Sequence, residues 1–124
     1  MTYDDITNAD EFARIRESSD PEEQTRATFA PASIAVWCSV IETYPHLKSW
    51  VVHNKTVPLE ILKQLSRDTD ARVRRATARK RKLDRVLFER LAADHDESVR
   101  RALAMNAKCP EDILCVLTAE FRDV

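Results

Sequence analysis

Residues 73–94, VRRATARKRKLDRVLFERLAAD, decide the fold because the same pattern stands on both sides of them. Residues 99–120, VRRALAMNAKCPEDILCVLTAE, align with this stretch without a gap at an offset of 26 positions. Residues 47–68, LKSWVVHNKTVPLEILKQLSRD, align with it at the same offset of 26 in the other direction. A fixed period of about 20 to 50 residues is typical of solenoids and other helical arrays. The sequence therefore predicts a repeat architecture.

Each copy of the pattern contains two apolar clusters at helical spacing. The first cluster has the spacing i, i+3, i+4, as at Val99, Ala102 and Leu103, which forms one face of a short α- or 3₁₀-helix. The second cluster has the spacing i, i+3, i+4, i+7 of an amphipathic helix, and in two copies it starts at a proline, Pro58 and Pro110. Neither helix can bury its apolar face alone, so stacking of neighbouring units is expected to supply the core.

We therefore predict an all-α fold that forms a single domain over residues 1–124. Its body is a short solenoid of about three 26-residue two-helix repeats, which span residues 44–69, 70–95 and 96–122. Residues 1–43 form an N-terminal helical cap that includes a degenerate repeat, since solenoids need atypical terminal units to cover their end faces.

The cap segment contains three helix-start signals. Thr7 or Asn8 can cap a first helix, and the pair Asp20-Pro21 starts a second. Ser33 can cap a third helix, which is apolar over most of its circumference and is expected in the interior.

Composition excludes several kinds of catalytic site. Glycine is absent from the 124 residues, which excludes the Gly-rich phosphate loop, the dinucleotide fingerprint and the Gly-x-Ser-x-Gly nucleophile elbow. The three cysteines form no Cys-x-x-Cys pair, and no two histidines have the i, i+4 spacing of a metal site on a helix. We therefore expect no metal, no cofactor and no enzymatic activity.

The same composition predicts a cytoplasmic protein. The acidic N-terminus lacks the apolar region of a signal peptide. No run approaches the roughly 18 apolar residues of a membrane span, so no membrane contact is expected. An odd number of unpaired cysteines indicates reduced thiols in a cytosol.

Charge is distributed unevenly along the chain. Residues 1–25 contain eight acidic and two basic residues, whereas residues 71–101 contain eleven basic and five acidic residues. Such asymmetry indicates either an electrostatic binding face or an acidic segment that folds over the basic one and masks it.

The strongest departure from the repeat pattern is a basic run in the middle copy. The flanking copies have asparagine in the slot of Lys80 and proline in the slot of Asp84, and no requirement of the fold explains either change. Three interpretations stay open: a solvated loop tethered to the acidic N-terminal segment, a docking patch for an acidic protein, and a contact with a nucleic-acid backbone. Aromatic residues make up 6% of the chain and none interleaves the run, which weakens the last interpretation. The candidate binding residues of the run are Arg79, Lys80, Arg81, Lys82 and Arg85.

Basic and acidic residues also recur at fixed slots of the repeat. Because they belong to the pattern, we interpret them as pairs whose charge-assisted hydrogen bonds join one repeat to the next. Contact of the two arginines with a ligand is the alternative. The basic slot holds Lys48, Arg74 and Arg100, and the acidic slot holds Asp68, Asp94 and Glu120.

An aromatic residue stands at one small-residue position of the repeat. Trp50 occupies a slot that holds alanine at residues 76 and 102. We interpret it as filling the junction with the cap alongside Trp37, and the alternative is an exposed anchor of the type found at interface hot spots. His53, in the loop that follows, is a further candidate for partner contact.

The three copies resemble a known family. The stretch VRRALAMNAKCPEDILCVLTAE is similar to the bacterial variant leucine-rich repeat, which is close to HEAT-like repeats and reads Val-Arg-Arg-x-Val-Ala, an Asn-Pro loop, then Thr-Pro-x-x-Val-Leu-x-x-Leu-Ala-x-Asp. The resemblance covers residues 44–122 and implies alternating α- and 3₁₀-helices in a right-handed superhelix. Members of the family have no common activity, so the resemblance implies a fold rather than a function.

These features favour a non-enzymatic module that binds another protein through a charged surface. The partner is expected to present an acidic face, and an immunity- or antitoxin-type inhibitor of a toxin or nuclease is one form of such a module. The alternative is a HEAT-like protein that binds nucleic acid through the basic run from Arg79 to Arg85. A HEAT-like DNA glycosylase would need a carboxylate and an aromatic residue at defined places. Asp84, beside the basic run, is the only residue of the sequence that matches part of such a site.

Overall fold

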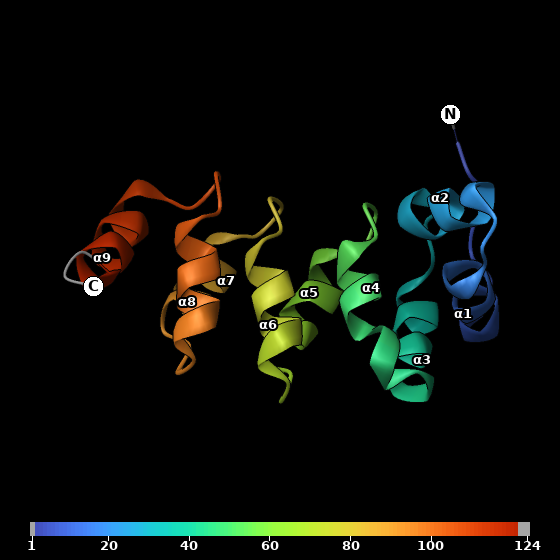
Figure 1. The fold of residues 1–124 in the computed structure, drawn as a ribbon, viewed down its shortest axis with the longest axis horizontal. Helices are drawn as coiled ribbons and strands as arrows, with labels where there is room; N and C mark the ends of the chain where they lie inside the picture. The colour runs from blue at the N-terminus through green and yellow to red at the C-terminus, as the bar shows by residue number, and fades with distance from the viewer. Residues whose placement is uncertain (1, 122–124) are drawn as a thin grey trace. The chain divides into compact units, whose positions relative to one another are not determined.

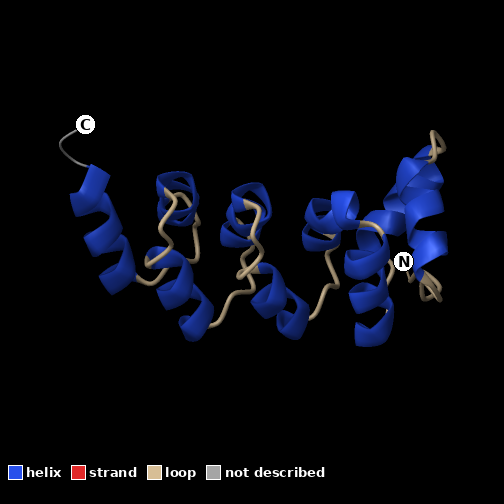
Figure 2. Cartoon of the chain, turned by 90° about the horizontal axis from the view of Figure 1, so that it is seen from below, coloured by secondary structure: helices blue, strands red, loops and turns tan. Residues whose placement is uncertain are grey.

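The computed structural model describes residues 2–121, and their regular structure is helical apart from an isolated bridge between Ile6 and Ala32 (Figures 1 and 2). The predicted all-α class is therefore confirmed. The chain divides into two compact units, residues 1–61 and 62–124. The last residue of the predicted repeat 96–122 and the C-terminal end at Val124 lie outside the described residues.

The helices of the first unit begin where the cap signals predict. Asn8, Asp20 and Ser33 cap successive helices, each accepting a hydrogen bond from a backbone N–H in the first helical turn. Such bonds satisfy N–H groups that have no partner inside the helix. The elements of this unit are α1 (Ala9–Glu17), α2 (Pro21–Phe29), α3 (Ile34–Thr43), η1 (Pro45–Leu47), α4 (Lys48–His53) and the start of α5 (Leu59–Leu65).

The core of the first unit forms between α1 and α3. Phe12 and Trp37 are both 0% exposed, and their rings meet edge to face with centroids 5.2 Å apart. This is a favoured geometry for an aromatic pair and adds to the burial of the two rings. Val40 is also 0% exposed, so the apolar third helix faces the interior as predicted, although Ile34 at its start is 47% exposed.

The second unit contains helices that recur at the period of the sequence. They are α6 (Ala71–Ala78), α7 (Arg85–Ala92), α8 (Glu97–Ala104) and α9 (Glu111–Phe121). The starts of α6 and α8 are 26 residues apart, as are the starts of α7 and α9. Within this unit α6 packs on α8 and α7 packs on α9, so equivalent helices lie side by side (Figures 1 and 2).

The apolar slots of the repeat form the core of this unit. Leu87, Leu91, Val99 and Leu103 are each 0% exposed, and Leu117 is 1% exposed. These positions belong to the two apolar clusters of the repeat, whose spacing predicts buried helix faces, and this prediction is confirmed. None of the helices in residues 2–121 combines the length and hydropathy that crossing a membrane requires.

Candidate partner-binding surface

A buried asparagine holds two loops of the second unit together. The side-chain nitrogen of Asn106, which is 8% exposed, donates to the carbonyl oxygens of Ala78 (2.8 Å) and Lys80 (2.7 Å). Its side-chain oxygen accepts from the backbone N–H of Lys108 at 2.8 Å. These three bonds satisfy main-chain groups that a neutral apolar side chain would leave unpaired. The loop after α8 is thereby fixed against the loop after α6.

The two loops enclose a hollow of about 320 Å³, whose lining includes Arg79, Arg81, Met105 and Asn106. Met105 is 83% exposed, the highest value among the large hydrophobic residues that the structure describes as exposed. Arg79 and Arg81 are exposed, and within residues 2–121 neither side chain forms an ion pair or a hydrogen bond. The arrangement therefore places two guanidinium groups that can bind a partner beside an exposed thioether. We call these three residues together with Lys80 and Lys82 the Arg–Met surface.

Lys80 and Lys82 complete the basic loop. Lys80 is half-buried, and its carbonyl oxygen receives the Asn106 bond, whereas Lys82 is exposed. Four of the five residues of the predicted basic run therefore lie on one loop. The fifth does not join them.

Arg85 lies on α7, where acidic neighbours hold it. Its Nε donates to Glu89 at 2.8 Å, and its Nη1 donates to Asp112 of α9 at 2.9 Å. The hydrogen bonds that it donates to Asp112, and then the one to Glu89, raise the pKa of this guanidinium above its ordinary value. The same contact with Arg85 lowers the pKa of the Asp112 carboxyl. Arg85 therefore links α7 to α9, and its charge is compensated within the unit.

Asp84 has a role in the fold that the sequence did not reveal. Its carboxylate accepts a hydrogen bond from the Leu87 N–H at 2.9 Å and so caps the first turn of α7. Lys63 lies 3.6 Å from the same side chain. The expectation that no requirement of the fold explains Asp84 is therefore wrong, because an N-cap replaces the helix-starting proline of the flanking copies.

The repeated charges pair in a different way from the predicted one. Arg74 pairs with Asp94 at 2.8 Å, and Arg100 pairs with Glu120 at 2.6 Å, so each arginine binds the acid at the end of its own repeat. The bond toward the preceding repeat goes to the main chain, because Arg100 Nη1 donates to the carbonyl oxygen of Asp94 at 2.6 Å. The prediction that acid–base pairs join one repeat to the next is therefore wrong. The contact with the preceding repeat is made through main-chain carbonyl groups.

The two arginines differ in how far they are buried, and this decides whether a partner could contact them. Arg74 is 6% exposed, which leaves no accessible guanidinium, whereas the Arg100 side chain is 21% exposed. Both are engaged in the bonds just described, and the pairing with Glu120 raises the pKa of Arg100. The geometry therefore favours the structural interpretation of this slot over contact with a ligand.

Trp50 lies on the surface of the first unit. It is 41% exposed, so it does not fill a buried junction alongside Trp37, and that interpretation is corrected. The guanidinium of Arg16 lies 3.9 Å from the centroid of its ring, and the exposed His53 meets the ring edge to face at 5.6 Å. One face of the indole is thus covered by a cation, an arrangement that stabilises both partners where solvent access is reduced.

The acidic residues of the N-terminal segment have partners inside the first unit. Glu23 pairs with Arg14, which lowers the pKa of Glu23. Glu11 pairs with Arg26 at 2.9 Å, and Asp10 accepts a hydrogen bond from Tyr44. Part of this acidic charge is therefore compensated locally. Masking of the basic run by residues 1–25 stays a prediction.

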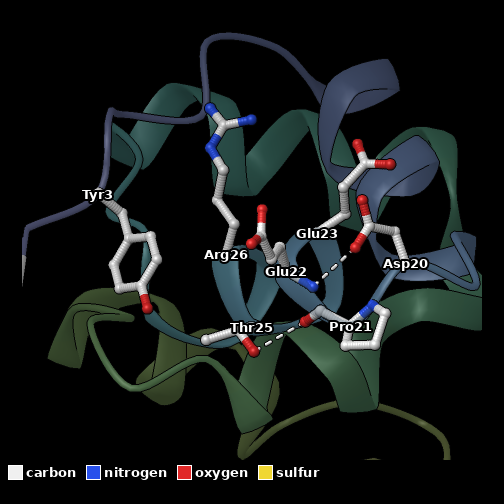
Figure 3. A pocket seen from close by; sticks show the side chains of 7 residues that line it. All are labelled: Tyr3, Asp20, Pro21, Glu22, Glu23, Thr25 and Arg26. Carbon is white, nitrogen blue, oxygen red and sulfur yellow. Dashed lines mark hydrogen bonds between the residues drawn. The ribbon is translucent and has the colours of Figure 1, made fainter.

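A further hollow of about 590 Å³ lies on α2 of the first unit (Figure 3). Several of the polar groups on its wall already form bonds within the first unit. Asp20 accepts from the Glu22 N–H at 2.9 Å, Thr25 donates to the Pro21 carbonyl at 2.8 Å, and Arg26 pairs with Glu11. This hollow therefore offers less uncommitted charge than the Arg–Met surface.

The described residues contain neither a disulfide among the three cysteines nor a group of three or more histidine, cysteine or acidic side chains that could hold a metal ion. Cys115 is exposed, and burial raises the pKa of the half-buried Cys109 thiol. A raised pKa disfavours the thiolate that acts as a nucleophile.

Met105 was not singled out by the sequence, although a signal for it exists. It stands in the slot of Arg79 and His53, so the three copies place three different exposed side chains at one point of the loop. No protein-family model matches the chain, and it has no match among curated proteins or solved structures.

Proposed function

We propose that this chain is a non-catalytic module that binds a protein partner through the Arg–Met surface. The observation that carries the proposal is the pair of exposed arginines Arg79 and Arg81, whose side chains have no partner among residues 2–121, beside the 83% exposed Met105. Exposed cations without partners favour an acidic counterpart, because charge complementarity speeds association and selects among partners. The partner is therefore expected to present a carboxylate-rich face.

Met105 favours a protein over a nucleic acid as that counterpart. Methionine and arginine are both enriched in protein interfaces, and a flexible thioether adapts to an apolar pocket. Nucleic-acid surfaces that bind single strands use aromatic rings on which bases stack. Among the residues that the structure describes, no tryptophan, tyrosine or phenylalanine lines this hollow. An exposed apolar side chain beside two cations suits a protein interface.

Rigidity of the two loops supports the same function. The buried Asn106 fixes the loop after α8 to Ala78 and Lys80, so Met105 and the arginines are held near one another before a partner arrives. Ordering loops during association costs free energy, and a preorganised surface avoids that cost. A dedicated inhibitor of the immunity or antitoxin type would use such a surface, since blocking a toxin or nuclease needs only shape and charge complementarity.

We also propose that the helices form a short solenoid of the variant leucine-rich repeat type. Support comes from the shared 26-residue offset of α6 with α8 and of α7 with α9. Further support comes from Asn54, whose side-chain nitrogen donates to the carbonyl oxygens of Ala27 (2.8 Å) and Ala30 (3.0 Å) at the end of α2. Asn106 makes the same kind of double bond to the end of α6, which favours a degenerate repeat in the N-terminal segment.

The experiment compares two double variants of equal charge. Arg79→Gln with Arg81→Gln removes two cations that pair with no side chain among the described residues, whereas Arg72→Gln with Arg101→Gln removes exposed arginines that pair with Asp70 and Glu97. Proteins captured from the source lysate are identified, and the purified partner is titrated against all three proteins at low and moderate salt. We expect the first variant to bind about tenfold or more weakly and the second to bind as the unaltered protein does.

A second arm distinguishes the nucleic-acid alternative, which the excess of basic residues in residues 71–101 favours. Fluorescence anisotropy with labelled duplex DNA and single-stranded RNA is measured over a series of salt concentrations. Affinity that falls steeply with salt and disappears in the Arg79→Gln, Arg81→Gln variant would establish that alternative. Equal binding of the identified partner by all variants would overturn the proposed surface.

A further inference from the structure

The second unit has another hollow, of about 560 Å³, at the ends of its helices where α5 meets α6 and α7 meets α8. Its wall includes Ser66, Arg67, Arg74 and Arg90. None of these residues belongs to the Arg–Met surface, which lies on the loops after α6 and α8. The hollow therefore has to be explained separately.

Arg90 is held in place by a neutral group. Its Nη1 donates to the hydroxyl oxygen of Ser66 at 3.1 Å, and the Ser66 hydroxyl in turn donates to the Lys63 carbonyl at 2.7 Å. Ser66 is 3% exposed, so this small chain of bonds is a fixed part of the fold. Within the part of the chain that the structure describes, Arg90 has no carboxylate partner. Its orientation is fixed while its charge is uncompensated.

Arg67 brings a second uncompensated charge to the hollow. Its side chain is exposed and makes neither an ion pair nor a hydrogen bond to any residue from 2 to 121. A guanidinium group carries five N–H donors in a planar fork. Arg67 and Arg90 together therefore retain most of their donors for a ligand.

The carboxylates on the wall are already committed to protein groups. Asp94 accepts from Arg74 at 2.8 Å and from the backbone N–H of Asp96 at 2.9 Å. Asp68 accepts from the backbone N–H of Asp70 at 3.0 Å. With His95 counted as neutral, three arginines face two aspartates on this wall, and the local charge is positive.

The repeat pattern does not require either arginine. The slot of Arg90 holds Gln64 in the preceding copy and Val116 in the following one. The slot of Arg67 holds alanine at residues 93 and 119. Two departures from the pattern thus meet in one hollow, although they stand 23 positions apart in the sequence.

We propose that this hollow is a binding site for a phosphate monoester or inorganic phosphate, with Arg67 and Arg90 as its ligand-binding residues and Ser66 as the residue that positions Arg90. A carboxylate has two oxygens, which a single guanidinium fork already uses. A phosphate group offers three or more acceptor oxygens and a larger negative charge, so it can accept from both forks together. The site is independent of the Arg–Met surface and of the partner that this surface binds.

The test follows the amide spectrum of the full chain by NMR at low ionic strength. Inorganic phosphate, O-phosphoserine and a phosphoserine-containing peptide are titrated separately, and acetate at matched ionic strength is the control anion. We expect saturable shifts at residues 66–69 and 90–95 with each phosphate compound and none with acetate. A phosphoserine affinity above that of inorganic phosphate assigns the site to a phosphorylated side chain, and equal affinities assign it to free phosphate.

Variants locate the binding. Arg67→Gln and Arg90→Gln should each weaken phosphate binding about tenfold, as expected on losing a charge-assisted hydrogen-bonding group. Ser66→Ala should weaken it less, because the charge of Arg90 remains. Arg79→Gln with Arg81→Gln should leave it unchanged. Because Arg67 is exposed, its variant is expected to keep the wild-type spectrum, so loss of binding there cannot be misfolding. Undiminished phosphate shifts in the Arg67→Gln protein, or equal shifts with acetate, would overturn the proposal.

Discussion

The guanidinium Nε of Arg74 lies 2.8 Å from a carboxylate oxygen of Asp94, and both side chains are 7% exposed. The two residues are twenty positions apart: Arg74 lies within α6, and Asp94 lies just beyond the end of α7. Nη1 of the same arginine donates to the carbonyl oxygens of Asp68 (2.7 Å) and Thr69 (3.2 Å). One side chain thus joins three segments of the unit in an environment that excludes most of the solvent.

Removing one partner of this pair is expected to destabilise the fold strongly. Arg74→Ala or Asp94→Ala leaves a buried charge without its partner, so the free energy of unfolding should fall by about 3–5 kcal/mol in urea denaturation. Arg100→Ala is the matched control, because its pair with Glu120 is more exposed (21% and 37%) and should cost about 1 kcal/mol or less. Equal losses at Arg74 and Arg100 would show that burial does not decide the value of these pairs.

The contrast between these two arginines shows what the repeat pattern could predict. Spacing predicted the all-α class, the helix starts after Asn8, Asp20 and Ser33, and the buried slots such as Leu91 and Leu103. These features depend on local periodicity and capping, which the sequence displays directly. The pattern also placed acids and bases near each other. It could not tell which acid each base meets, because that choice depends on packing in three dimensions.

Asn106 is expected to contribute more stability than an exposed asparagine does. Asn106→Ala removes the donor to the buried carbonyl of Ala78 and the donor to the half-buried carbonyl of Lys80, and an unpaired buried group costs about 1–3 kcal/mol. The free energy of unfolding should fall accordingly, and the Lys108 amide should lose protection from hydrogen exchange. Asn8→Ala, which removes an exposed cap at α1, should cost about 1 kcal/mol. Unchanged protection of Lys108 would contradict the role given to Asn106.

The candidate surface was only partly visible in the sequence. The basic run stood out as a departure from the pattern, and four of its residues lie on one loop. Arg85 could not be separated from them, because its partner Asp112 lies 27 residues away on α9. Met105 was overlooked because a single exposed methionine has no signature until its neighbours in space are known.

The pair of Arg85 and Asp112 should have a clear signature in an acid titration. Because Arg85 lowers the pKa of the Asp112 carboxyl in the folded chain, the pair stabilises the fold above the ordinary carboxyl value of 3.8. That stabilisation is lost as pH falls from there through the lowered pKa. In Arg85→Gln the pKa of Asp112 should rise toward 3.8, measured from its side-chain carbon shift by NMR. Arg72→Gln should leave it where it is.

The two tryptophans provide a final test, because one lies in the core and the other on the surface. Trp37 is 0% exposed against Phe12, and Trp50 is 41% exposed under the guanidinium of Arg16. Trp37→Ala should lower the free energy of unfolding by about 3–5 kcal/mol, the range for a buried aromatic. Trp50→Ala should cost about 1 kcal/mol, since it loses a partly exposed cation–π contact and some packing.

Fluorescence quenching distinguishes the two rings in the folded protein. Acrylamide should quench the Trp37→Phe variant, which retains Trp50, more strongly than the Trp50→Phe variant, which retains only the buried ring. Arg16→Gln should increase quenching of Trp50 by uncovering one face of the indole, because the guanidinium lies 3.9 Å from the ring centroid. Equal quenching of the two single-tryptophan variants would mean that Trp50 is buried. That outcome would support the interpretation that Trp50 fills the junction with the cap.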